Sequence, residues 1–143
     1  MNLKQVTICA LIVELILAAV LLRVCHAETI TDEQAVKCLL GEARGENYAS
    51  LLGHAEAIRN RGTLSGVYGC RADLSREWPY IVRTGIDKQA RQAWQESKYS
   101  NTVDGADHWG SVVVDKAWIK TMIKAGYVKT ATIKNTVFYR EVK

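Results

Sequence analysis

One glutamate stands where a buried helix face would be expected. Glu42 ends a series with three- and four-residue spacing, the spacing of side chains that share one face of a helix. The earlier members are apolar: Ala35, Cys38 and Leu39. A carboxyl group drawn towards such a face loses water, which favours its protonated form. It can then donate a proton near neutral pH and take it back, so Glu42 is a candidate acid/base. The alternative is a surface glutamate that swings into solvent near the helix end.

A glycosidase is one class of enzyme that needs this acid, because the leaving oxygen of a glycosidic bond must be protonated. Glu42 stands in the run Gly41-Glu42-Ala43-Arg44-Gly45-Glu46. Glu46 lies four residues further along the chain. It would bind substrate or polarise the site, unless it is a solvated residue just past the helix end. The sequence offers no other obvious second acid.

Three further candidates for a cleft lie in predicted loops, where side chains are more often functional than in helices. Tyr68 belongs to the glycine-punctuated loop 62–69, and His108 and Trp109 belong to the loop 98–111. An aromatic ring can stack on a sugar face, and an imidazole can bond a hydroxyl group. We interpret these three residues as substrate-binding. The alternatives are a plain connection at 62–69 and a core position for Trp109.

The remaining tryptophans, Trp78, Trp94 and Trp118, are interpreted as core residues. His54 is interpreted as a surface or core histidine on a helix. The chain has three histidines without metal-ligand spacing and no Cys-x-x-Cys pair, so we expect neither a metal nor any other cofactor.

The elements that must position these residues are mostly helices. Thr31 and Gln34 form a capping-box pattern at the start of the first one, for which Gly45 is a plausible stop. Two later helices are expected to end at Gly62 and Gly126. The last segment alternates Thr, Val, Ile, Phe and Tyr around Lys134-Asn135, which is typical of a hairpin. The sequence predicts a mainly helical α+β domain with helices at 31–45, 49–61, 87–97 and 115–125 and a small C-terminal β-hairpin at 128–142.

Residues 1–27 look like an export signal rather than part of the domain. They contain Lys4, an apolar stretch over 6–22 and the end Val24-Cys25-His26-Ala27, which fits a secretory signal peptide. The stretch is also near the length that spans a bilayer, so an uncleaved membrane anchor is the alternative. Either interpretation leaves residues 28–143 as one exported domain, periplasmic or extracellular.

Two cysteines remain after the predicted signal. Cys9 and Cys25 fall within it, which leaves Cys38 and Cys70. An even number of cysteines in an exported domain predicts a disulfide bond between them. Such a bond would stabilise a small domain by roughly 3–4 kcal/mol in the loop-entropy picture.

The charge of the chain does not by itself select a partner. The sequence has a formal net charge of +4, and its basic residues are scattered. A weakly basic surface is compatible with plain solubility or with an anionic polymer such as cell wall or nucleic acid. No recognised nucleic-acid motif is present, so we expect no nucleic-acid partner, and we expect a monomer.

Several motifs, in order, resemble those of one family. The runs 40–46 and 55–61 (Ala-Glu-Ala-Ile-Arg-Asn-Arg) are similar to the two conserved stretches of the cell wall hydrolase family that includes the spore-cortex-lytic (SleB-type) enzymes. The family then has a Gly-Ala-x-His/Tyr-aromatic element, a tryptophan and a terminal aromatic pair. This chain has the corresponding run Gly-Ala-Asp-His-Trp at 105–109, then Trp118, and then the pair Phe138-Tyr139, in that order.

The resemblance implies a lysozyme-like fold and action on peptidoglycan glycan strands. The bond would be the one from N-acetylmuramic acid to N-acetylglucosamine, with Glu42 as the general acid/base. Many members are lytic transglycosylases, which need no second carboxylate because the muramyl 6-hydroxyl attacks within the same sugar. The family's aromatic end would place Tyr139 in the substrate groove.

The chain also departs from the family pattern. His54, Glu56 and Arg59 stand in a helix that usually alternates Ala and Val, and Trp78-Pro79 replaces a Phe-Pro element. These changes bear on the substrate rather than on the fold. Separately, a catalytically inactive peptidoglycan-binding module of the same fold is the alternative hypothesis.

Overall fold

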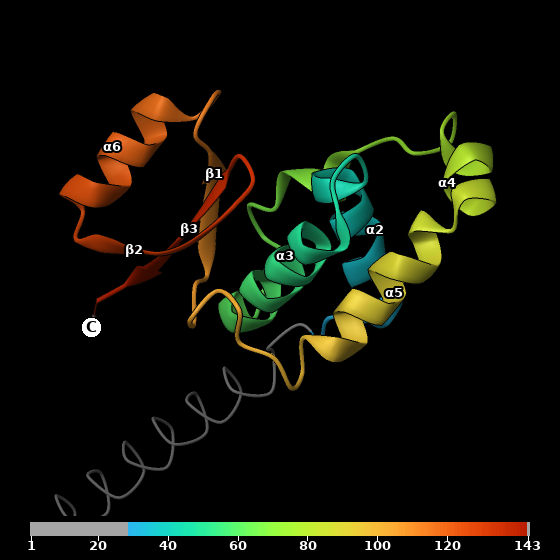
Figure 1. Cartoon of the computed structure of the whole chain (residues 1–143), viewed down its shortest axis with the longest axis horizontal. Coiled ribbons are helices and arrows are strands. Elements are labelled where there is room, and N and C mark those ends of the chain that lie inside the picture. Colours follow the sequence, from blue (N-terminus) through green and yellow to red (C-terminus); the bar gives the residue numbers. More distant parts are fainter. Residues whose placement is uncertain (1–28, 143) are drawn as a thin grey trace, which may run out of the picture.

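The computed structural model describes residues 29–142 as a group of helices beside a small sheet (Figure 1). The predicted fold class, mainly helical α+β with a C-terminal hairpin, is confirmed. The proposed signal peptide or anchor at 1–27 lies outside the described residues. In chain order the elements are α2 (Asp32–Ala43), α3 (Tyr48–Arg61), the 3-10 helix η1 (Tyr68–Arg71), α4 (Trp78–Thr84), α5 (Ile86–Glu96), β1 (His108–Ser111), α6 (Lys116–Lys124), β2 (Tyr127–Ile133) and β3 (Thr136–Glu141).

Most helix ends follow the local signals of the sequence. The Thr31 hydroxyl accepts a bond from the backbone N–H of Gln34, and the Gln34 side chain accepts one from the backbone N–H of Thr31, so the capping box is confirmed. Gly62 and Gly126 follow α3 and α6 with φ of 70° and 89°, a conformation that glycine adopts without strain. The predicted stop at Gly45 is wrong, since α2 ends at Ala43 with Arg44 as its cap.

Three elements were not predicted. α4 is only seven residues long, with Pro79 in its first turn, and is too short to show a clear apolar period. η1 is a single turn within a glycine-rich stretch. The segment 108–111, predicted as loop, forms β1, because it pairs antiparallel with β3. Long-range pairing of this kind leaves no local signal.

The two parts of the molecule meet at α3. Helices α2, α3, α4 and α5 form one side in Figure 1, and the sheet with α6 forms the other. The sheet is antiparallel in the order β1-β3-β2, and β2 and β3 form the predicted hairpin around Lys134-Asn135. α3 packs against α2 and α5 on one side and against β1 and β2 on the other. Side chains that α2 and β1 direct towards this junction therefore come from distant parts of the chain.

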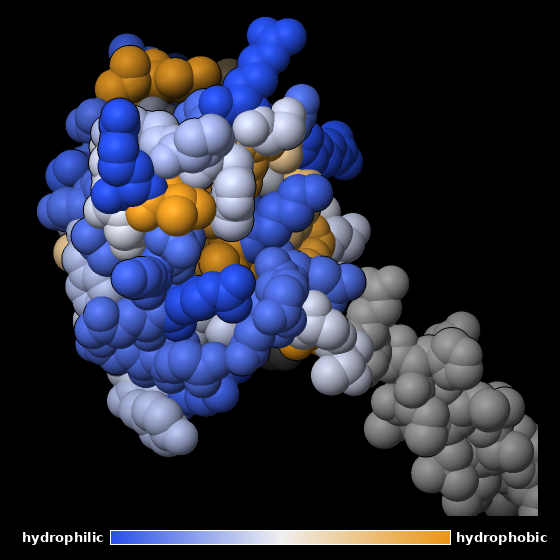
Figure 2. Space-filling model, turned by 90° about the vertical axis from the view of Figure 1, so that its right-hand side faces the viewer, coloured by the Kyte–Doolittle hydropathy of each residue, from blue (hydrophilic) through white to orange (hydrophobic). Residues whose placement is uncertain are grey.

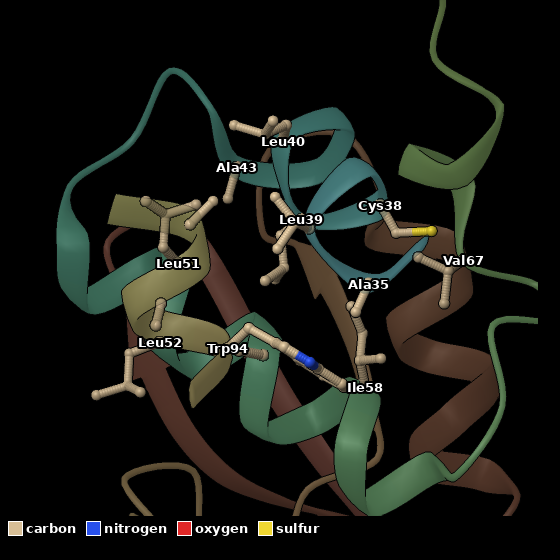
Figure 3. Packing of buried hydrophobic residues seen from close by; sticks show 14 of the residues in the cluster. Ala35, Cys38, Leu39, Leu40, Ala43, Leu51, Leu52, Ile58, Val67 and Trp94 are labelled. Carbon is tan, nitrogen blue, oxygen red and sulfur yellow. The ribbon is translucent and has the colours of Figure 1, made fainter. Parts of the chain in front are cut away.

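The main hydrophobic core lies among the helices. Figure 3 shows Leu39 of α2, Leu51 and Ile58 of α3 and Trp94 of α5 packed together, and all four are at most 2% exposed. Trp94 is thus a core residue, as predicted. Trp78 is 45% exposed, so its predicted core position is wrong.

The face that carries α4 and α5 shows hydrophobic residues only as separate patches among hydrophilic ones (Figure 2). In the part of the chain from 29 to 142, the helices are too short or too polar to cross a bilayer.

Candidate active site

A cleft of about 600 Å³ opens between the helices and the sheet. The helical side contributes Glu42, Glu46, His54 and Tyr68, and the sheet side contributes His108, Trp109, Asp115 and Trp118. Five of the predicted site residues, drawn from the two halves of the chain, therefore line one cavity. Ligand sites occur preferentially at such junctions between structural units.

Glu42 lines this cleft, and its carboxyl group accepts hydrogen bonds from both walls. Its Oε1 accepts a hydrogen bond of 2.7 Å from the backbone N–H of Gly69, and its Oε2 accepts one of 3.3 Å from the indole N–H of Trp109. Gly69 belongs to η1 on the helical side, and Trp109 belongs to β1. The carboxyl group is partly buried and cannot swing freely into solvent as an ordinary surface glutamate would.

A second cavity of about 350 Å³ also reaches Glu42. It is lined by Arg44, Glu77 and Tyr80 among others, and the Arg44 guanidinium donates two hydrogen bonds of 2.6 Å to Glu77. These bonds lower the pKa of Glu77. Glu42 thus lines both cavities.

The position of Gly69 depends on an unusually close backbone contact. A Cβ atom on Gly41 would lie 2.0 Å from the carbonyl oxygen of Gly69, and one on Gly69 would lie 2.7 Å from Cγ of Glu42. The predicted disulfide bond between Cys38 and Cys70 is confirmed and joins the same two segments. Glycine at both positions and the disulfide bond together dock η1 onto α2, and this puts the N–H of Gly69 on Glu42.

The other two carboxyl groups that line the cleft already accept hydrogen bonds. Glu46 accepts a bond from the Ser50 hydroxyl, and Asp115 accepts one of 2.7 Å from the backbone N–H of Ser111. Asp115 was not among the predicted site residues. It immediately precedes α6, a position where aspartate is common at helix starts, so the sequence did not single it out.

The aromatic residues of the cleft differ in exposure. Tyr68 is 79% exposed at the rim, whereas Trp109 is partly buried beside Glu42. Trp118 lines the cleft, so its predicted core position is wrong. Tyr139, which the family resemblance placed in the groove, does not line it: the side chain is 2% exposed, and its ring packs edge-on against Trp118 at 6.1 Å.

The predicted polar residue of the sheet side, His108, is oriented by its neighbour. Its Nδ1 lies 2.8 Å from Oδ1 of Asp107, and its ring packs edge-on against Tyr127 at 4.8 Å between centroids. Asn60, at the end of α3, donates a bond of 2.9 Å to the carbonyl oxygen of Ala106 and so ties this segment to the helices.

His54 was not predicted as a site residue, yet it lines the cleft. Burial lowers the pKa of its imidazole below the usual value, although the Ser50 carbonyl and the carboxylates of Glu42 and Glu46 act in the opposite direction. A histidine within a helix gives no sequence signal that separates this position from an ordinary core position. Among residues 29–142, no three His, Cys, Asp or Glu side chains come together as a metal site would require.

No family model matches the chain, and no curated protein matches it. Among solved structures, the fold is similar to the catalytic domain of the germination-specific lytic transglycosylase SleB from Bacillus anthracis. The TM-score is 0.54 at 19% sequence identity, and the match covers 79% of this chain and 98% of that one. The predicted lysozyme-like fold is thereby confirmed.

Proposed function

We propose that this chain degrades peptidoglycan and cleaves the bond from N-acetylmuramic acid to N-acetylglucosamine, with Glu42 as general acid/base. The observation that carries the proposal is that the carboxyl group of Glu42 accepts hydrogen bonds from N–H donors on both walls of a cleft. Similarity of fold to the lytic transglycosylase domain supports the same substrate class. A surface glutamate with no catalytic role has no need of this setting.

The proposed reaction begins with proton transfer. Glu42 gives its proton to the glycosidic oxygen, and the bond from that oxygen to C1 of the muramyl residue breaks with positive charge developing at C1. The 6-hydroxyl of the same muramyl residue then attacks C1 and returns its proton to Glu42. The products are a free 4-hydroxyl on the glucosamine and a 1,6-anhydromuramyl end.

The other carboxyl groups of the cleft support transglycosylation over hydrolysis. A hydrolase that retains or inverts configuration needs a second carboxylate as nucleophile or as base for water. Glu46 and Asp115 are the available candidates, and each is already bonded to a neighbouring serine. An intramolecular attack by the 6-hydroxyl needs neither of them.

The aromatic side chains supply surfaces for the sugar rings. Tyr68, Trp109 and Trp118 line the cleft from both sides, and flat aromatic faces can stack on the apolar faces of sugars. The Cys38–Cys70 disulfide supports export, because such bonds persist in oxidising compartments. In this proposal residues 1–27 direct the export or anchor the protein in the membrane.

Analysis of the products tests the reaction. Purified peptidoglycan incubated with the protein is expected to lose turbidity and to release muropeptides that end in 1,6-anhydromuramic acid. Mass spectrometry separates the outcomes, since an anhydro end weighs one water less than a reducing end. If all the released fragments carried reducing ends, the reaction would be hydrolysis and not transglycosylation. Binding to the wall without any release of fragments would favour the inactive binding module instead.

The indole N–H of Trp109 gives a second test of the site. Trp109→Phe keeps an aromatic ring but removes the donor to Glu42, so we expect kcat/KM to fall about tenfold, the effect of losing one hydrogen bond to a charged group. Trp94→Phe is the matched control: the indole N–H of this core residue donates to Asp32, an exposed residue at the start of α2 that does not line the cleft. The control should lose stability and keep its activity per folded molecule. Equal activity losses in both variants would argue against a role of the Trp109 donor.

A further inference from the structure

His54 holds one tautomer. The side chain belongs to α3 and is 3% exposed, and its Nδ1 lies 2.7 Å from the carbonyl oxygen of Ser50. A carbonyl oxygen only accepts hydrogen bonds, so Nδ1 must carry the proton and donate it. Burial lowers the pKa of His54, and the ring is therefore neutral at pH 7. In a neutral ring protonated at Nδ1, the other nitrogen, Nε2, is an acceptor.

The other ring nitrogen of His54, Nε2, has no hydrogen-bond partner among residues 29–142. Within residues 29–142, the ring makes its one hydrogen bond through Nδ1. The fully buried side-chain N and O atoms without a partner in this part of the chain are Oε1 of Glu56 and Oδ1 of Asp87. Nε2 of His54 is not one of them, so it keeps contact with solvent. We infer that this contact is made inside the cleft, because His54 lines it.

The ring is fixed in orientation and lies close to the proposed acid. Its edges pack against Trp109 at 5.5 Å and against Phe138 at 5.3 Å between centroids. Trp109 in turn donates its indole N–H to Glu42. The ring of Trp109 thus contacts both the imidazole of His54 and the carboxyl group of Glu42, so His54 and Glu42 lie in the same part of the cleft.

We propose that Nε2 of His54 is a substrate-binding acceptor. It takes a hydrogen bond from a neutral donor, a hydroxyl or an acetamido N–H, of the sugar that lies against Trp109. This inference rests on the proposed function of the cleft. A rigid acceptor at this point favours sugars that present a donor there, because a bound analogue without the donor would shield Nε2 from water and leave it unpaired.

Three replacements separate the acceptor from a packing role. His54→Gln can place an amide oxygen near the position of Nε2, whereas His54→Asn reaches only the position of Nδ1, and His54→Phe keeps the ring without either nitrogen. We expect KM for soluble, uncrosslinked glycan strands to rise about 3- to 10-fold in the Asn and Phe variants, the effect of one neutral hydrogen bond. Their kcat should stay within about twofold, and the Gln variant should recover most of the wild-type KM.

A binding assay without turnover gives a second readout. Each His54 variant is combined with Glu42→Gln, and co-sedimentation with purified peptidoglycan measures the dissociation constant. We expect the same order of variants as for KM. Leu52→Ala is the control for stability. Leu52 is buried in the same helix and does not line the cleft. Its replacement should lower the melting temperature without raising KM.

The outcomes distinguish this inference from the proposed function. If wild type cleaves glycan strands and the Gln, Asn and Phe variants all keep its KM, or all lose activity only in proportion to their stability, the acceptor role is overturned alone. If wild type neither binds nor cleaves the strands, the proposed function fails, and the role of His54 fails with it.

Discussion

Glu42→Gln is expected to lower peptidoglycan cleavage by about 10²- to 10⁴-fold, the range that a general acid/base contributes. The amide keeps the shape of the side chain but cannot donate a proton to the glycosidic oxygen. Its oxygen can still accept the bond from Gly69, while the weaker bond from Trp109 is lost. We therefore expect a change in the free energy of unfolding of about 1 kcal/mol or less. Turbidity loss and fragment release, with thermal unfolding as the check of folding, measure both effects.

Glu33→Gln is the matched control for this change. Glu33 lies on the same helix, and its side chain is 76% exposed in a long contact with Arg91. An exposed ion pair of this kind contributes little, so the control should match wild type in both activity and stability. If Glu42→Gln retained more than about a tenth of the wild-type rate, the acid would have to be another group, and Glu46 would be the next residue to test.

Gly41→Ala is expected to have the largest effect on stability of any single methyl addition in α2. Alanine inside a helix is favoured over glycine by about 1 kcal/mol. At Gly41 this gain is opposed by a contact of 2.0 Å between the new Cβ and the carbonyl oxygen of Gly69. Backbone atoms cannot move aside as a flexible side chain would, so we expect overpacking to cost about 3 kcal/mol, the upper end of its usual range. The net loss of stability is then about 2 kcal/mol, because the helix preference offsets part of this cost.

The same substitution should also impair activity in the molecules that remain folded. Moving η1 away from α2 moves the N–H of Gly69 away from Oε1 of Glu42. Gly45→Ala is the control, because a Cβ there meets nothing within 4 Å, and its melting temperature should stay at or above that of wild type. Equal stability of the two alanine variants would mean that η1 does not pack on α2 as described.

The fold could be predicted from the sequence where local physics decides it. The capping box at Thr31, the glycines after α3 and α6, and the hairpin around Lys134-Asn135 each carry a local signal, and all four are present in the structure. The short α4 and the strand β1 could not be predicted, since one has too few residues to show a period and the other is a strand only by pairing with β3.

The candidate site, like the fold, could be predicted from the sequence only in part. Helical spacing alone marked Glu42 as an acid on a buried face, and the cysteine count alone indicated the bond from Cys38 to Cys70. Tertiary structure decided what surrounds the carboxyl group. Gly69 and Trp109 are 27 and 67 residues away from Glu42 in sequence, and only the close packing of η1 on α2 and the pairing of β1 with β3 bring their N–H groups to it.

The same distinction explains why two aromatic residues lie elsewhere than the sequence predicted. Tyr139 and Trp118 are both aromatic and both lie in amphipathic segments, so composition cannot say which one faces the cleft. The packing of α6 over the sheet puts Trp118 in the wall and Tyr139 behind it. Periodicity specifies which side of an element is apolar, but only the partner packed against that side decides whether it becomes core or cleft.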